Sequence, residues 1–104
     1  MANFQKMGGM GGGGNMQAMM RQAQEMQKQI EKTKEELAET VIEASVGGDM
    51  VKVEMTGAYE LINLKIKPEA LDPEDPEMTE DLVIACVNEV INQVSELRKQ
   101  RLPM

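Results

Sequence analysis

The spacing of apolar residues changes twice along this chain of 104 residues, and those changes constrain the fold more than any other feature. Between residues 15 and 39, apolar residues recur at alternating steps of three and four, which is typical of one face of a helix. Over residues 41–67 they alternate with polar residues, which is typical of strands. Beyond residue 75 the helical spacing returns. The pattern therefore predicts an α+β fold in the order helix, three-stranded antiparallel meander, helix.

The first predicted helix, residues 15–39, carries a narrow apolar stripe on a surface rich in Gln, Lys and Glu. At 1.5 Å per residue it is about 37 Å long, whereas the strands of such a sheet span roughly 20 Å. Part of this helix must therefore project beyond the sheet or pair with another helix. The predicted seam for a dimer or a second helix consists of Met16, Met19, Ala23, Met26, Ile30 and Leu37.

Short connections that contain glycine separate the three predicted strands, at Gly47-Gly48-Asp49 and at Gly57-Ala58. Pro68 ends the third strand, and the second helix is expected to begin at Asp75-Pro76 or at Thr79. The apolar positions of this helix cover a wide face, which indicates that it packs on the sheet. An uninterrupted apolar run, residues 82–87, predicts burial nearly all round the helix at that end.

Residues 1–14 end in a run of glycines interrupted only by Met10, and they are predicted to form a flexible tail. Residues 15–102 are then expected to form a single domain. A phosphate-binding loop is the alternative for such a run. It would require Lys followed by Ser or Thr after the last glycine, where Asn15-Met16 stands, and no strand precedes the run.

Two residue types limit the chemistry that is open to the chain, because it has no histidine and a single cysteine, Cys86. Histidine is the commonest general base at neutral pH and a common metal ligand. We therefore expect no enzyme activity, no cofactor or metal, and no small-molecule substrate. The sequence shows no signal peptide and no apolar run near the roughly 18 residues of a membrane span, so a cytoplasmic location without a membrane partner is expected.

Charge is sorted along the chain, whose net charge is −7. Residues 1–34 carry five basic and two acidic side chains, and residues 97–104 carry three basic side chains and no acid. Residues 35–96 carry three lysines and sixteen acids. Salt screens the repulsion of this acidic middle beyond about 8–10 Å, so the basic ends can still contact the phosphates of a polyanion. The candidate residues for such contacts are Arg21, Lys28, Lys32, Lys34, Arg98, Lys99 and Arg101.

Four segments resemble, in the same order, the YbaB/EbfC family of bacterial nucleoid-associated proteins. Residues 15–27 are similar to the first helix of that family, residues 47–57 to its central hairpin, residues 66–68 to the end of its third strand, and residues 80–89 to the start of its last helix. The resemblance implies a cytoplasmic homodimer at the nucleoid, whose long helices project from a joined β body and bind double-stranded DNA.

The expected binding is salt-sensitive and largely tolerant of sequence, with an effect on nucleoid organisation and gene expression. Ordinary solvated side chains are the alternative for each basic residue taken singly. One alternative function is a protein-interaction module in which the helices grip a helix of another protein. Another is thioether binding of Cu(I) by the six methionines near the start, although methionines at helical spacing usually pack. Those residues are Met7, Met10, Met16, Met19, Met20 and Met26.

Overall fold

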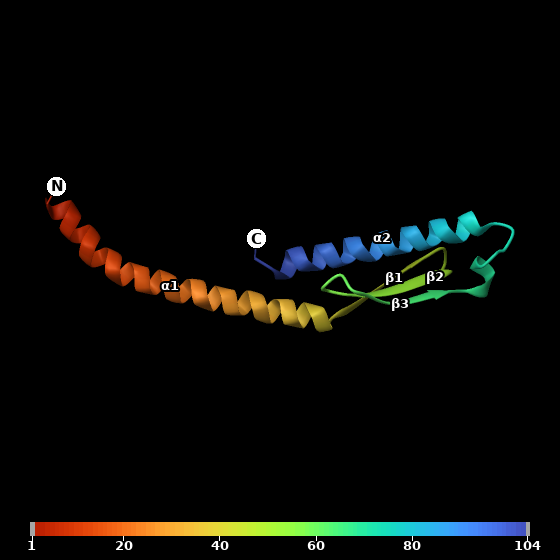
Figure 1. The fold of residues 1–104 in the computed structure, drawn as a ribbon, viewed down its shortest axis with the longest axis horizontal. Coiled ribbons are helices and arrows are strands. Elements are labelled where there is room, and N and C mark those ends of the chain that lie inside the picture. Colours follow the sequence, from red (N-terminus) through yellow and green to blue (C-terminus); the bar gives the residue numbers. More distant parts are fainter. Residues whose placement is uncertain (1, 104) are drawn as a thin grey trace. The chain divides into compact units, whose positions relative to one another are not determined.

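The computed structural model describes the backbone of residues 2–103 and the side chains of residues 15–103. Its elements are helix α1 (Ala2–Glu39), strands β1 (Val41–Val46), β2 (Val51–Thr56) and β3 (Leu61–Ile66), the short 3-10 helix η1 (Pro68–Ala70) and helix α2 (Pro76–Arg101) (Figure 1). The predicted order of helix, three-stranded antiparallel sheet and helix is confirmed. The chain divides into two units, residues 1–32 and residues 33–104.

Helix α1 begins at Ala2, earlier than the start at Asn15 that the sequence predicts. Its backbone thus includes the glycine-rich segment that was expected to be a tail. Each glycine costs a helix about 1 kcal/mol relative to alanine, so intrinsic propensity does not explain this start. The boundary between a tail at 1–14 and a domain at 15–102 stays a prediction. The side chains of Met7 and Met10 lie outside those that the structure describes.

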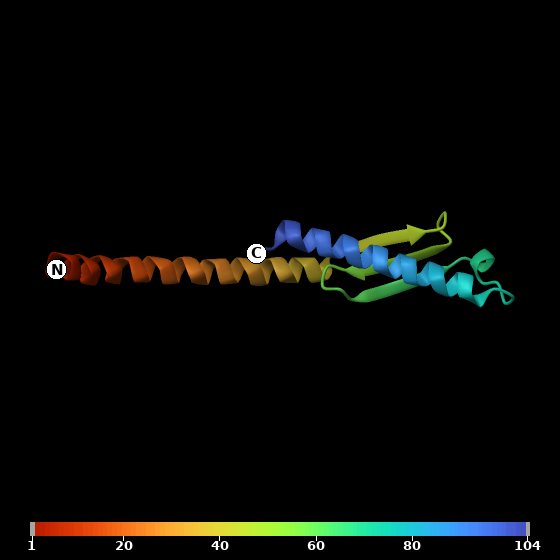
Figure 2. The same cartoon turned by 90° about the horizontal axis from the view of Figure 1, so that it is seen from above.

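The sheet has the strand order β1-β2-β3, and both neighbouring pairs are antiparallel. Ala44 lies opposite Val53, which in turn lies opposite Leu64. An irregularity in the β2–β3 ladder falls between Glu54 and Met55, where β3 carries one extra residue. Helix α2 lies across one face of this sheet (Figure 2).

The core of residues 33–104 lies between α2 and the first two strands. It is aliphatic, and its buried members are Ala44, Val51, Val53, Met55, Cys86, Val90 and Val94. The three from α2 recur every four residues and therefore share one side of the helix. Ile84 is 58% exposed, so the predicted burial nearly all round the start of α2 does not occur within a single chain. Two leucines of β3 are also open to solvent, since Leu61 and Leu64 are each 43% exposed.

The turn between β1 and β2 depends on a left-handed backbone. Gly47, Gly48 and Asp49 have φ angles of 63°, 65° and 68°. Glycine adopts this region without strain, and aspartate tolerates it better than most residues do. Asp75 caps α2, because its side chain accepts a hydrogen bond from the Met78 amide at 3.2 Å. The Asp75-Pro76 start is thereby confirmed over the Thr79 start.

Gly57 fastens the last turn of α1 to the sheet. Its amide donates to the carbonyl oxygens of Leu37 at 2.8 Å and Thr40 at 2.9 Å. Leu37 is fully buried inside the subunit, next to Gly57, and this departs from its predicted place in a seam between helices. The spacing of the stripe does not reveal this difference, because Gly57, which Leu37 contacts, lies twenty residues further along the chain.

Candidate nucleic-acid interface

Three of the predicted DNA-binding side chains lie on one side of α1. Arg21, Lys28 and Lys32 are all exposed. At about 100° per residue, their positions fall within an arc of about 40° around the helix axis. At 1.5 Å per residue they extend along about 16 Å of that axis. We call these three residues the cationic face of α1.

None of these three cations forms an ion pair with a side chain of residues 15–103. Glu25, which lies four residues after Arg21 and three before Lys28, is also not a member of the ion pairs of this part of the chain. The cationic face therefore presents three charges that are available to an outside anion.

The apolar stripe of α1 lies roughly opposite the cationic face, by the same helical geometry. Met16 is 62% exposed, Met19 is 66% exposed and Met26 is 56% exposed. Ala23 is also exposed, and Ile30 is partly buried. A helix that packed on this stripe would leave the cationic face open to solvent.

Lys34 is exposed but does not extend the cationic face. It follows Lys32 by two residues, and two residues of an α-helix rotate the side chain by about 200°. Lys34 therefore points to the side of the helix that carries the apolar stripe.

The three basic residues near the C-terminus are engaged within residues 33–104. The Arg98 guanidinium donates to the Gly57 carbonyl at 2.8 Å and stacks over the Tyr59 ring at 5.2 Å. Arg101 forms an ion pair with Glu36 at 3.1 Å, so the last turn of α2 is tied to the last turns of α1. Lys99 pairs with Glu96 at 3.7 Å, and both side chains are about two-thirds exposed, so this pair is weak.

Within the described part of the chain, no three His, Cys, Asp or Glu side chains lie close enough together to bind a metal ion. Met16, Met19, Met20 and Met26 are all exposed on α1. The same part of the chain contains no helix both long enough and apolar enough to span a membrane.

Cys86 fills the space between α2 and the sheet. It is fully buried, and its Sγ lies 3.4 Å from the carbonyl oxygens of Ala44 and Val51, either of which can accept the single S–H proton. Burial raises the pKa of the Cys86 thiol. A thiol that stays neutral and enclosed is a packing group and a poor nucleophile.

The raised pKa of Cys86 makes folding stability depend on alkaline pH. Below the ordinary thiol pKa of about 8.5, the thiol is neutral in both states and its full contribution is present. As pH rises further, the unfolded thiol ionises first, so the free energy of unfolding falls. In urea unfolding between about pH 7 and pH 10, the free energy of unfolding of Cys86→Ala is expected to lack this part of the decline. Parallel curves for the two proteins would contradict this.

The fold and the surface together define a class: a small α+β protein in which a three-stranded meander lies between two helices in the sequence and the first helix carries a cationic face. A family model described as the YbaB/EbfC DNA-binding family matches residues 10–103. The chain belongs to this family. The family is described by DNA binding and not by a catalytic activity.

Relatives share most of their length with this chain. A nucleoid-associated protein of Moorella thermoacetica is 52% identical over 86 residues, which cover 83% of each chain. One of Alkaliphilus metalliredigens is 49% identical over 89 residues, 86% of this chain and 78% of that protein. The crystal structure of an uncharacterized Helicobacter pylori protein, HP0035, is similar with a TM-score of 0.71 and 28% identity, over 79% of this chain and 86% of the other.

Proposed function

We propose that this protein binds duplex DNA as a homodimer at the bacterial nucleoid, through the cationic face of α1 and without catalysis. The observation that carries the proposal is the arrangement of Arg21, Lys28 and Lys32, three exposed cations on one side of a helix without an ion pair among the described residues. Membership in a DNA-binding family and the names of the nucleoid-associated relatives support it.

The length of the cationic face suits a phosphate backbone. Phosphates of one DNA strand are spaced by about 3.4 Å along the helix axis, so about 16 Å corresponds to about five base pairs. Lysine and arginine contacts to phosphates carry no direct sequence information. Tyr59 is the one aromatic residue among the described side chains, and its ring lies under the Arg98 guanidinium. We therefore expect no stacking of bases on aromatic side chains of this part of the chain. We therefore propose binding that is largely independent of base sequence.

A second copy of the chain is the proposed cover for exposed apolar residues in each of the two units. In residues 1–32 these form the methionine stripe of α1, and in residues 33–104 they include Leu61 and Leu64 of the edge strand β3 and Ile84 of α2. An unpaired edge strand and a contiguous apolar stripe are unfavourable in water, and a partner subunit would bury both. Dimerisation would also double the number of cations that meet the DNA from three to six.

The remaining four predicted contact residues receive a lesser role in this proposal. Arg98 and Arg101 act mainly within the fold, since each already has a partner in its own subunit. Lys34 and Lys99 are exposed and add to the general attraction of a polyanion without belonging to the cationic face.

The second candidate function is a module that grips a helix of another protein. The exposed methionines of α1 favour it, because flexible thioether side chains adapt to varied apolar partners. Such binding would depend little on salt, whereas phosphate contacts weaken steeply as salt is added.

A mobility shift with two unrelated duplexes of equal length tests the proposal, together with a mass measurement of the free protein. We expect affinities for the two duplexes that differ by less than about tenfold, since specific sites are preferred by about 10³ or more. We expect a mass of two chains of 11.5 kDa each. A strong preference for one duplex, or a monomer mass, would contradict the corresponding part of the proposal.

A further inference from the structure

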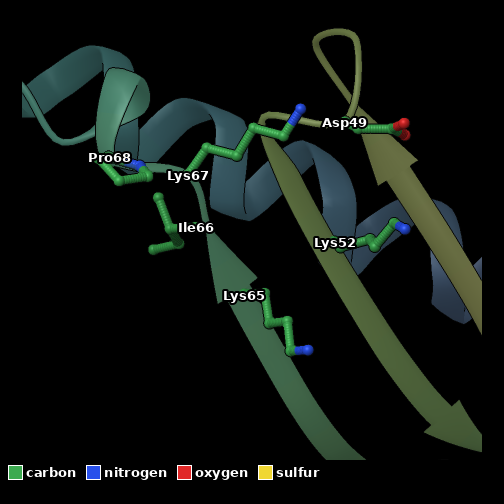
Figure 3. Close-up of a pocket in the computed structure, with 6 residues that line it drawn as sticks. All are labelled: Asp49, Lys52, Lys65, Ile66, Lys67 and Pro68. Atoms are coloured by element: carbon green, nitrogen blue, oxygen red, sulfur yellow. The ribbon is translucent and has the colours of Figure 1, made fainter.

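The acidic middle of the chain, residues 35–96, contains three lysines, and all of them line one hollow on the sheet. The hollow has a volume of about 540 Å³ and is lined by Asp49, Lys52, Lys65, Ile66, Lys67 and Pro68 (Figure 3). We call Lys52, Lys65 and Lys67 the sheet lysines. The whole cluster lies within residues 33–104.

The register of the strands brings the sheet lysines together. Lys52 of β2 lies directly opposite Lys65 of β3. The neighbours of Lys52 along β2, Val51 and Val53, are buried against α2, so Lys52 faces the other side of the sheet. Lys67 follows Lys65 by two residues and shares its side, and its amide donates to the Met50 carbonyl at 2.8 Å.

Like charges that face each other across a strand pair destabilise a sheet. Lys52 is partly compensated by an ion pair with Glu43 at 3.6 Å, in which both side chains are about half exposed. The β1 residue opposite Lys52 is the neutral Ser45. Lys65 and Lys67 take part in none of the ion pairs of residues 15–103. An external anion bound between these lysines would offset their mutual repulsion.

We propose that the sheet lysines form a second phosphate-binding site, which takes a phosphodiester of duplex DNA. The inference rests on the proposed function and adds to it a contact surface outside α1. Lysines bind phosphate as point charges, without the fixed geometry of arginine, which suits contacts that tolerate any sequence. Asp49 lies at the rim of the same hollow and opposes the anion, so it limits the affinity of the site.

The test is the double variant Lys65→Gln/Lys67→Gln, which keeps Lys52 and its ion pair with Glu43. We expect its affinity for duplex DNA at about 0.1 M salt to fall by about five- to tenfold, because phosphate contacts and their counterion release are lost. Asp49→Asn removes the negative charge from the lining of the hollow, so it is expected to raise the affinity for duplex DNA. Asparagine tolerates the φ angle of 68° at this position, so the turn is preserved.

The matched control is Asn88→Asp/Asn92→Asp, which alters the net charge by the same two units at exposed positions of α2. We expect this control to bind like the original protein. An unchanged affinity of the lysine variant would overturn the inference. Equal losses in the lysine variant and the control would also overturn it, since the effect would then follow from net charge alone.

A titration with inorganic phosphate separates this inference from the proposed function. We expect the amide resonances of Lys65 and Lys67 in the original protein to shift and saturate, and the Gln variant to show no such response. If the original protein binds duplex DNA but the amide resonances of Lys65 and Lys67 do not respond to phosphate, the inferred site at the sheet lysines is wrong and the proposed function stands. If the original protein binds no duplex at all, the proposed function fails. A phosphate response of Lys65 and Lys67 in that case would mean that the sheet lysines bind free phosphate and not DNA.

Discussion

Changing Arg21, Lys28 and Lys32 together to glutamate is expected to abolish the retardation of duplex DNA and to leave the mass of the free protein unchanged. The reversal replaces three attractive contacts per subunit by three repulsive ones. A protein with six phosphate contacts loses about 10³ in affinity when they are screened between 50 and 200 mM salt, so their reversal has at least that effect. A mobility shift measures the binding, and light scattering measures the mass.

The control for this prediction separates the position of the charges from the net charge. The neutralising variant Arg21→Gln/Lys28→Gln/Lys32→Gln removes three charges from the cationic face of α1. The variant Asn88→Asp/Asn92→Asp/Gln93→Glu changes the net charge equally at exposed positions of α2. Only the first is expected to weaken binding strongly. Retention of binding in the glutamate triple would place the DNA surface elsewhere, and equal losses in the two matched variants would attribute the effect to net charge.

Gly57→Ala is expected to lower the free energy of unfolding by about 2–4 kcal/mol, through overpacking and a lost hydrogen bond. A Cβ at this position would lie 2.5 Å from the Leu37 carbonyl oxygen and 2.9 Å from the Leu37 Cβ. The oxygen belongs to the backbone at the end of α1, so relief requires the helix end to move. That movement would break the hydrogen bond from the Gly57 amide to Leu37.

Gly48→Ala is the matched control for that substitution. Gly48 has open space around it, with no atom within 4 Å of an added Cβ, but its φ angle is +65°. The left-handed conformation alone should cost about 1–2 kcal/mol. Urea unfolding of both variants is measured at one protein concentration, because association into the proposed dimer would add to the apparent stability. A loss at Gly57 no larger than the loss at Gly48 would contradict the close approach.

The order of elements could be predicted because local patterns determine it. The change from helical to alternating spacing separates α1 from the strands, and Asp75-Pro76 combines a cap with a residue suited to a first helical turn. The apolar run at the start of α2 is misleading, since Ile84 has no cover within the described subunit. Whether Ile84 is covered depends on contacts with another chain, and the apolar pattern of a single chain does not indicate such contacts.

The site could be predicted in part, and the limit is set by contacts between distant residues. The cationic face of α1 follows from spacings of seven and four within one helix. Arg98 and Arg101 have partners 41 and 65 residues away, and no local pattern indicates these. The sheet lysines were missed for the same reason, because they meet only through the register of β2 with β3. Alternation places Lys52 and Lys65 on the polar face, and an antiparallel meander implies that their strands pair, but the sequence does not give the register that sets these two residues opposite each other.

The salt dependence of duplex binding tests the central claim most directly, since that claim is a contact between helix cations and phosphates. With six cations from the two subunits of the proposed dimer, the logarithm of the binding constant should fall linearly with the logarithm of salt concentration, with a slope of about −5 or steeper. A slope near zero would contradict the claim and favour an apolar grip on a partner protein. Failure to bind any duplex in dilute buffer would contradict it as well.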